Sequence, residues 1–353
     1  MKKGIFVIYE ENRRDYVPKY IALNSVERQD IVIIKENPSP RFNTSLNIEE
    51  DDLFRYFNVI TGEIIVSLQT LMQAYDVSKK IVPMILSHLD KEYDYVYAFY
   101  PNLFSLYVGM LLSKSIRIPL FIDIDYVPSS ENHFLSYIEK TILDKAVNKS
   151  KGIILSSPML IDDFNIDYVV SRTSYFISNK IRKKCLHRLK TIQQEPTIVV
   201  PTPIDSETLY YLSGELDFAR FIVVGQCGEK IKRDNVSYFP YIPPLTFKQI
   251  ICRSDIGLII PPKMIKGFPS IIVDFITMGK PIVSSSLLGE TSFIDTYDIG
   301  EVAETKEELL YAIRNTLLEY PKKVENVFVT ASSIFNPYVQ GSVVLKYLTE
   351  KLK

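Results

Sequence analysis

The sequence predicts an α/β protein built from two doubly wound, Rossmann-like domains. The chain has 353 residues, which is enough for two cores because single domains usually span about 100–200 residues. Short, fully apolar runs alternate with segments of helical period, a pattern typical of parallel strands covered by helices on both faces. This alternation occurs in both halves of the chain, so we expect one sheet in each.

The first half supplies one predicted sheet. Residues 5–9 and 31–35 are short runs of large apolar residues and are predicted to be strands, with a helix at 18–28 between them. The polar stretch 36–52 is rich in Asn, Ser, Pro and Glu, so we predict a loop there. The other predicted elements are helices at 63–89, 101–113 and 134–148 and strands at 93–97, 120–124 and 152–155.

The second half repeats the scheme after a predicted interdomain connection at 197–205. We predict a first domain at 1–196, a second at 197–335, and a last helix at 336–353 that packs back on the first. Eight of the 13 glycines lie between residues 214 and 300, which indicates that the second domain approaches a ligand. Its predicted elements are strands at 221–224, 236–239, 256–260, 281–284 and 301–303 and helices at 247–253, 270–278 and 306–319.

Composition argues against several classes of protein. The net charge of −1 gives no global attraction to nucleic acid, and three histidines are few for a zinc site or a histidine-dependent triad. The three cysteines are far apart and odd in number, so we predict no disulfide framework and a reducing, cytoplasmic setting. No apolar run approaches membrane-spanning length.

The basic segment 179–190 is the candidate for peripheral membrane contact. Ile181, Cys185 and Leu189 share one face at helical spacing, and lysines and arginines surround them. Such a helix can rest on an anionic membrane. It can also be a solvated helix whose long side chains cover the sheet, and we favour this interpretation.

The stretch 263–284 carries the clearest chemistry. Gly267 lets the backbone approach a ligand, and Pro269 suits the first turn of a helix that we predict over 270–278. A helix that begins after such a loop directs free N–H groups and a partial positive charge outward, an arrangement that binds phosphate. Asp274 lies one turn inside this helix, within reach of a ribose hydroxyl.

This stretch also resembles a family signature. Gly267-Phe268-Pro269, Asp274 and Met278-Gly279-Lys280-Pro281-Ile282-Val283 are similar in order and spacing to the donor-binding motif of GT-B fold glycosyltransferases that use nucleotide sugars, especially family 4. The first of that motif's two acids is replaced by Lys266. The usual glycine-rich loop after the first strand is missing, as is the usual Arg/Lys pair at the start of the second domain.

The resemblance implies two domains facing across a cleft and a metal-independent hexosyltransferase of glycan biosynthesis, with no bound cofactor. The first domain would hold a glycan, lipid-linked or protein acceptor, and the second the nucleotide-sugar donor. Gly225 and Gln226 resemble the turn beside the nucleotide, and Tyr241 is a candidate for stacking on the base. The donor-binding candidates are Gly225, Gln226, Tyr241, Pro261, Lys263, Gly267, Phe268, Pro269, Ser270 and Asp274.

The catalytic candidates are Lys266, Asp123 and Asp125. Lys266, with Lys263, would replace the missing cations and stabilise the departing diphosphate; otherwise both lysines belong to a solvated loop. Asp123 or Asp125 would be the general base if the sugar is transferred with inversion, whereas the retaining mechanism of family 4 needs none. The two acids also fit a strand-end cap, or the metal-binding Asp-x-Asp of the unrelated GT-A architecture, which the motif order disfavours.

Two other functions remain open at this point. One is a GT-B fold epimerase that acts on a nucleotide sugar alone. The other is a non-catalytic GT-B module that serves as a binding partner or scaffold, which the replaced acid and the missing Arg/Lys pair favour. The sequence does not identify the donor sugar or the acceptor.

Overall fold

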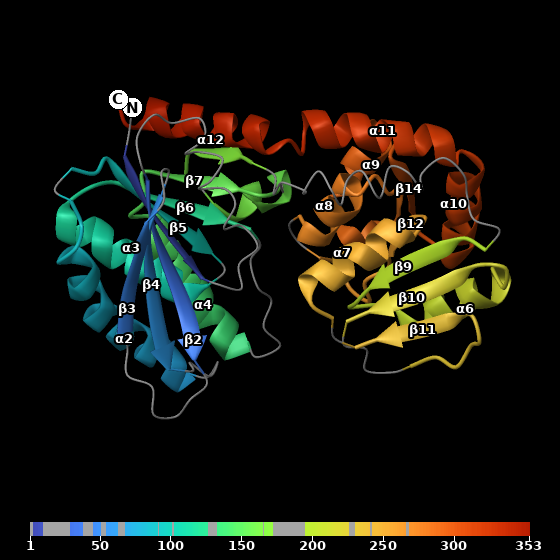
Figure 1. Ribbon diagram of the computed structural model, residues 1–353, viewed down its shortest axis with the longest axis horizontal. Helices are drawn as coiled ribbons and strands as arrows, with labels where there is room; N and C mark the ends of the chain where they lie inside the picture. The colour runs from blue at the N-terminus through green and yellow to red at the C-terminus, as the bar shows by residue number, and fades with distance from the viewer. Residues whose placement is uncertain are drawn as a thin grey trace. The chain divides into compact units, whose positions relative to one another are not determined.

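The computed structural model describes residues 3–9, 29–37, 45–50, 54–62, 68–90, 92–100, 102–125, 133–164, 166–171, 195–225, 230–240, 242–265 and 268–353. The chain divides into two compact units (Figure 1), one of residues 1–173 with 337–353 and one of residues 174–336. Each unit contains one mainly parallel sheet with helices, as predicted. Within the described ranges, no helix is both long and apolar enough to span a membrane.

The first unit contains an eight-stranded sheet in the order β3-β4-β2-β1-β5-β6-β7-β8. Every neighbouring pair is parallel except β3 with β4. The strands are β1 (Gly4–Tyr9), β2 (Gln29–Asn37), β3 (Ser45–Glu50), β4 (Phe54–Gly62), β5 (Tyr95–Tyr100), β6 (Leu120–Ile124), β7 (Gly152–Leu155) and β8 (Tyr168–Val170). The helices are α2 (Leu68–Leu86), α3 (Leu103–Ile116), α4 (His133–Val147), the 3-10 helix η2 (Pro158–Asp163) and α12 (Pro337–Lys351).

The predicted loop at 36–52 is wrong in its described part. β2 continues to Asn37, and β3 forms an antiparallel edge strand on β4, which the sequence analysis missed. β3 is largely exposed, so its polar residues face water and conceal the strand pattern. In β4 only some side chains, such as Phe54, Phe57 and Val59, are buried. The predicted helix at 18–28 and the segment 179–190 lie outside the described residues.

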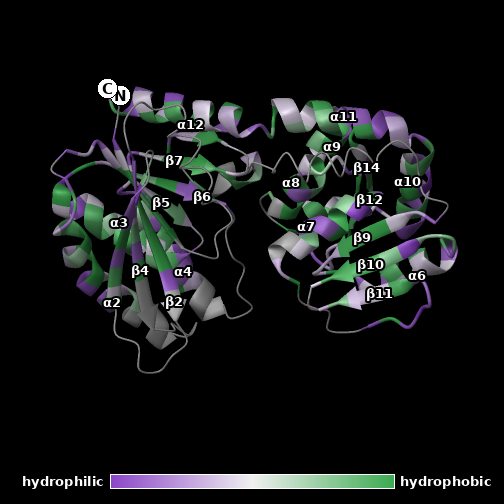
Figure 2. Ribbon diagram, viewed as in Figure 1, coloured by the Kyte–Doolittle hydropathy of each residue, from purple (hydrophilic) through white to green (hydrophobic). Residues whose placement is uncertain are grey.

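Each face of the first sheet has its own core. One face carries aliphatic residues such as Val7 and Ala98, packed with residues of α2, α3 and α4. The other carries aromatic residues of the central strands, packed against α12. Tyr347 of α12 fits over Gly152, where a Cβ would lie 2.2 Å from its hydroxyl, and that hydroxyl donates to Asp167 O over 2.7 Å. Hydrophobic and polar residues alternate along α12 (Figure 2), as expected for a helix with one buried face.

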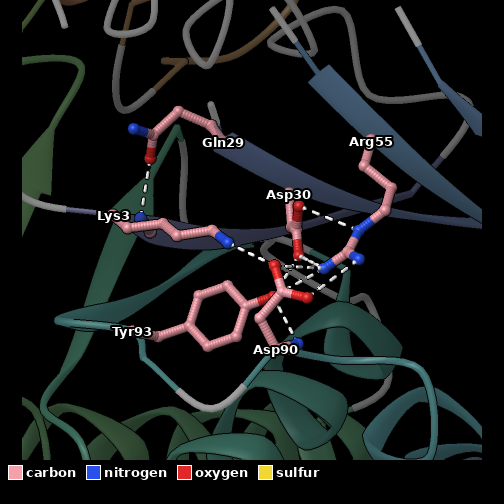
Figure 3. Close-up of polar contacts among 7 residues, drawn as sticks. Lys3, Gln29, Asp30, Arg55, Asp90 and Tyr93 are labelled. Carbon is pink, nitrogen blue, oxygen red and sulfur yellow. Dashed lines mark hydrogen bonds and ion pairs between the residues drawn. The ribbon is translucent and has the colours of Figure 1, made fainter. Parts of the chain in front are cut away.

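Charged side chains gather at the amino edge of the first sheet (Figure 3). Arg55 binds Asp30 through two nitrogens, at 3.2 Å and 2.5 Å, and also donates to Tyr93 Oη over 2.8 Å. Asp90 accepts from Arg55 and, over 2.5 Å, from Lys3 Nζ. Burial alone would lower the pKa of Arg55, but the hydrogen bond and charge of Asp30 raise it. This amino-edge network joins the starts of β1, β2, β4 and β5.

The second unit contains a six-stranded, fully parallel sheet in the order β11-β10-β9-β12-β13-β14. The strands are β9 (Thr197–Pro201), β10 (Arg220–Val224), β11 (Val236–Phe239), β12 (Ile256–Ile259), β13 (Ile282–Ser285) and β14 (Gly300–Ala303). The helices are α6 (Ser206–Glu215), α7 (Pro244–Arg253), α8 (Ser270–Thr277), the 3-10 helix η3 (Ser286–Leu288), α9 (Ser292–Thr296), α10 (Lys306–Leu318) and α11 (Tyr320–Ser333).

The prediction of an interdomain connection at 197–205 is wrong. Residues 197–201 form β9, which lies between β10 and β12 near the centre of the second sheet. Ile198, Val199 and Val200 are fully buried, because a central parallel strand is covered on both faces. The segment was predicted as a linker because it resembles the interdomain linker of the family; its prolines at 201 and 203 stand at the strand's end, where no further pairing is required.

Buried polar groups also anchor the amino edge of the second sheet. Lys323 of α11 is 4% exposed; its ammonium donates to Asp298 Oδ1 over 2.5 Å, to Glu301 Oε1 over 3.1 Å and to Gly300 O. The Asp255 carboxylate accepts from Thr197 N over 2.8 Å, and burial raises its pKa.

Cys252 of α7 is disulfide-bonded, although no disulfide framework was predicted. The two other cysteines of the chain, Cys185 and Cys227, lie outside the described residues. Three widely spaced cysteines gave no sign of this bond, because a disulfide depends on proximity in the fold rather than on spacing in the chain.

Candidate functional site

The carboxyl edge of the second sheet is the candidate site. The sheet is parallel, so the carboxyl ends of all its strands lie at one edge. The chain builds outward from β9 to β11 on one side and from β12 to β14 on the other, so the strand order reverses between β9 and β12. Open α/β sheets bind ligands at the carboxyl ends of the strands beside such a reversal.

Backbone hydrogen bonds hold the loops of this edge together. Asp205 N, in the loop after β9, donates to Ile260 O after β12 over 2.7 Å. Ile265 N, in the loop after β12, donates to Leu287 O after β13 over 2.9 Å. Within the loop after β12, Pro261 is buried and Lys263 is exposed, so of these two predicted donor-binding residues only the lysine side chain is open to solvent.

Gly225 ends β10 in a conformation that favours glycine. Its φ is +113°, and a Cβ there would lie 2.0 Å from Thr202 Oγ1 in the loop after β9. Thr202 N donates to Val224 O over 2.9 Å, which fixes this close approach. The predicted donor-binding Gly225 therefore lies at the candidate site. Its predicted neighbours Gln226 and Tyr241 lie outside the described residues.

α8 begins at the same edge. Ser270 is the first residue of α8 and Pro269 is its N-cap, so the proline stands just before the first turn, in which it was predicted. The side chain of the N-cap residue accepts no hydrogen bond from the first N–H groups of the helix. A helix start without a side-chain cap leaves N–H groups for another acceptor, such as a phosphate oxygen. Lys266 and Gly267 lie outside the described residues, so the roles predicted for them stay predictions.

Phe268 anchors the loop before α8. Its side chain is 2% exposed and stacks on Phe335, with ring centroids 5.6 Å apart, while Phe293 lies 5.3 Å away. The phenyl ring thus belongs to an aromatic cluster of the core, and it fixes where Pro269 and the start of α8 lie. Any contact of Phe268 with a donor must pass through its backbone.

The side chain of Asp274, a predicted donor-binding residue, is almost fully buried. It is 1% exposed, and its Oδ1 lies 3.9 Å from Nζ of Lys248, which belongs to α7. A buried carboxylate needs a partner, because its desolvation is costly. The sequence analysis missed Lys248, since nothing in a single sequence pairs side chains of two separate helices.

Glu290 is a second residue that the sequence analysis missed. It follows η3 and Gly289 in the loop after β13 and is 4% exposed. This loop is the one bonded to Ile265, so a buried acid adjoins the candidate donor-binding segment. An acid directly after a glycine, a few residues beyond a predicted strand end, was a signal that could have identified it.

The first unit holds the two acids considered as a general base. Asp123, within β6, is 1% exposed and accepts a 2.7 Å hydrogen bond from Tyr97 Oη. Asp125 follows β6; it is half-buried, its N donates to Tyr100 O over 3.2 Å, and its carbonyl accepts from Ser156 Oγ. Asp125 thus lies at the carboxyl edge of its sheet, whereas Asp123 is enclosed in the core.

Two observations concern the charges that could meet a diphosphate. The opening strand of the second domain is present as β9, but residues 197–219 contain neither lysine nor arginine, so the usual cations are indeed absent from it. In the part of the chain that the structure describes, no group of three or more His, Cys, Asp or Glu side chains is arranged to hold a metal ion.

Solved structures share this architecture along the whole chain. An α,α-trehalose-phosphate synthase (UDP-forming) from Burkholderia vietnamiensis matches 99% of this chain and 100% of its own, with a TM-score of 0.71 and 8% identity. The corresponding enzyme from Burkholderia xenovorans, in complex with glucose-6-phosphate, matches 98% and 99%, with a TM-score of 0.68 and 8% identity.

An E. coli structure, described as trehalose-6-phosphate bound with UDP-2-fluoro glucose, matches 99% of both chains with a TM-score of 0.72 and 10% identity. No protein-family model and no curated protein matches the sequence. At such low identity these likenesses establish the fold, and the protein has the GT-B fold of two Rossmann-like domains, as predicted.

Proposed function

We propose that the protein is a glycosyltransferase that binds a nucleotide-sugar donor at the carboxyl edge of its second sheet. The observation that carries the proposal is the start of α8, which has no side-chain cap and lies at the edge where the strand order reverses. The solved structures of like fold include a UDP-forming synthase and a structure bound with a UDP sugar, which supports this class of donor.

The chemistry proposed for the site follows from its charges. The bond between the anomeric carbon and the diphosphate oxygen breaks, and the negative charge that develops on the diphosphate faces the N–H groups of α8. The exposed Lys263 is available as a cation at the same edge, and we propose Lys266 as the second. In this proposal these groups take the place of a metal ion.

The acceptor is proposed to bind the first unit. An acceptor hydroxyl attacks the anomeric carbon and loses its proton. If the configuration is inverted, the proton passes to Asp125, because this acid lies beyond the strand end and is half-buried, whereas Asp123 is covered and hydrogen-bonded by Tyr97. If the configuration is retained, the proton passes to the departing diphosphate and no protein base takes part.

A thermal-shift screen over nucleoside diphosphates and their sugars tests the donor part of this proposal. A donor that binds the folded protein at 100 times its Kd should stabilise it by about 2.7 kcal/mol. Incubation of the best donor with glycan, lipid-linked and peptide acceptors then tests transfer. Conversion of the donor to a second nucleotide sugar without acceptor would instead identify an epimerase.

A non-catalytic GT-B module is the second candidate. The observation that favours it is the absence of lysine and arginine from residues 197–219, where related enzymes would hold the diphosphate. No stabilisation by any nucleoside diphosphate or nucleotide sugar would support the module and contradict the glycosyltransferase.

A further inference from the structure

Lys248 and Asp274 form an ion pair close to the candidate donor site. α7 leads into β12 and α8 into β13, so both helices begin at the carboxyl edge of the second sheet. Each residue lies about one turn inside its helix. The pair therefore lies about one turn below the edge at which the diphosphate is proposed to bind.

The two members of the pair differ in exposure. The Asp274 side chain is 1% exposed, whereas that of Lys248 is 22% exposed, and 3.9 Å separates Oδ1 from Nζ. A substrate reaches the ammonium more readily than the covered carboxylate. The carboxylate also restrains the position of the lysine side chain. Of the two, Lys248 is thus the residue placed to touch a ligand.

In the proposed function the diphosphate binds at the start of α8, and the ribose is inferred to lie beside the first turns of α7 and α8, where the Lys248 side chain is 22% exposed. Ribose hydroxyl oxygens accept hydrogen bonds, and a lysine ammonium has three donors. We propose that Lys248 binds the ribose of a ribonucleoside diphosphate and that Asp274 is a positioning residue for Lys248. This inference rests on the proposed function and shifts the ribose contact from the acid to the lysine.

The test compares ribose with deoxyribose. Isothermal titration calorimetry gives the Kd of the wild-type protein for UDP, GDP and ADP and for their 2′-deoxy forms. We expect the ribonucleotide to bind more tightly, and Lys248→Met to reduce this preference by about tenfold, as expected for loss of a charged hydrogen-bond donor. Asp274→Asn should reduce it too, and the double variant by no more than Lys248→Met, since both act through one contact.

Two further variants distinguish the loss of a ribose contact from a loss of protein stability. Lys306→Met removes an exposed ion pair with Glu207, of 3.6 Å, in the same unit and should leave the preference unchanged. Lys248→Gln keeps most of the side-chain length and an N–H donor, and serves if Lys248→Met does not fold.

The outcomes distinguish this inference from the proposed function. If the wild-type protein binds ribonucleotides and the Lys248 variants keep the full preference for ribose, the inference is wrong while the proposed function stands. Equal weakening of both nucleotide forms would place Lys248 on the phosphates and also overturn it. If the wild-type protein binds none of the six probes and no nucleotide of the thermal-shift screen stabilises it, the proposed function fails and the inference with it.

Discussion

The amino edges of the two sheets and the carboxyl edge of the second sheet are held together in different ways. At the amino edges, ionised side chains form dense networks, with Arg55 between Asp30 and Asp90 in the first unit and Lys323 between Asp298 and Glu301 in the second. At the carboxyl edge, backbone groups bond the loops to one another, as with Asp205 N and Ile260 O.

From this difference we expect the amino edges to contribute stability and the carboxyl edge of the second sheet to bind the ligand. At the amino edges, oppositely charged side chains pair with one another and hold the starts of the strands in place. At the carboxyl edge of the second sheet the start of α8 has no side-chain cap and the Lys263 side chain is exposed, and we propose that these groups meet the substrate. Substitutions at the amino edges should therefore change the free energy of unfolding, whereas substitutions at the carboxyl edge of the second sheet should change ligand binding.

Arg55→Met should have the largest effect on stability. It removes the guanidinium that binds Asp30, which is 1% exposed, and leaves that carboxylate buried without its cation. Loss of one partner from a buried ion pair costs about 3–5 kcal/mol, which chemical denaturation measures. Arg314→Met, at an exposed position, is the matched control and should cost little. An equally small loss in both variants would contradict the stabilising role of the network.

Lys266→Ala should act on turnover instead. If Lys266 stabilises the departing diphosphate, kcat should fall by roughly 100-fold or more while the denaturation midpoint stays unchanged. Steady-state kinetics with the donor identified by the screen measure this. Lys346→Ala, an exposed lysine of α12, is the control. Unchanged turnover would remove Lys266 from the mechanism.

Gly225→Ala should affect both properties. A Cβ at this φ of +113° would collide with Thr202 Oγ1, so the loops after β9 and β10 must separate. We expect a loss of about 1–3 kcal/mol in stability together with weaker nucleotide binding. Gly214→Ala, within α6, meets only the flexible end of Arg233 and should be tolerated. Full nucleotide affinity in Gly225→Ala would show that this turn is remote from the donor.

Asp90→Asn should have the smallest effect, and one that depends on pH. The hydrogen bond from Lys3 lowers the pKa of Asp90 below its ordinary value, so its contribution is complete above the unfolded pKa and is lost as the pH falls through the folded pKa. Because its side chain is 54% exposed, we expect a Tm only roughly 1–3 °C below wild type at pH 7. The difference should shrink near pH 3, and a constant difference would contradict the assignment.

The sequence predicted the elements whose own residues determine them. Buried parallel strands such as β5 and β12 are apolar throughout, so they stand out from their surroundings. The exposed edge strand β3 has no such contrast, and the resemblance of residues 198–205 to a family linker concealed the central strand β9. Strands such as β5 and β12 were thus predicted, whereas the exposed strand β3 was missed and β9 was taken for a linker.

The candidate site was predicted in part for the same reason. The helix start after Phe268 and Pro269 follows from local sequence, and the structure has it. The pairing of Asp274 with Lys248 depends on how two helices pack, which one sequence does not reveal. The stacking of Phe268 on Phe335 joins residues 67 positions apart in the chain, so a single sequence does not show that this side chain lies in the core.

The position of α12 has a consequence for how the protein is made. Its Tyr347 covers Gly152, and its apolar side completes the aromatic face of the first unit, yet this helix follows the whole second unit in the sequence and is synthesised after it. Although domains commonly fold from the N-terminus onward during synthesis, here the first unit to be translated is the second to be finished.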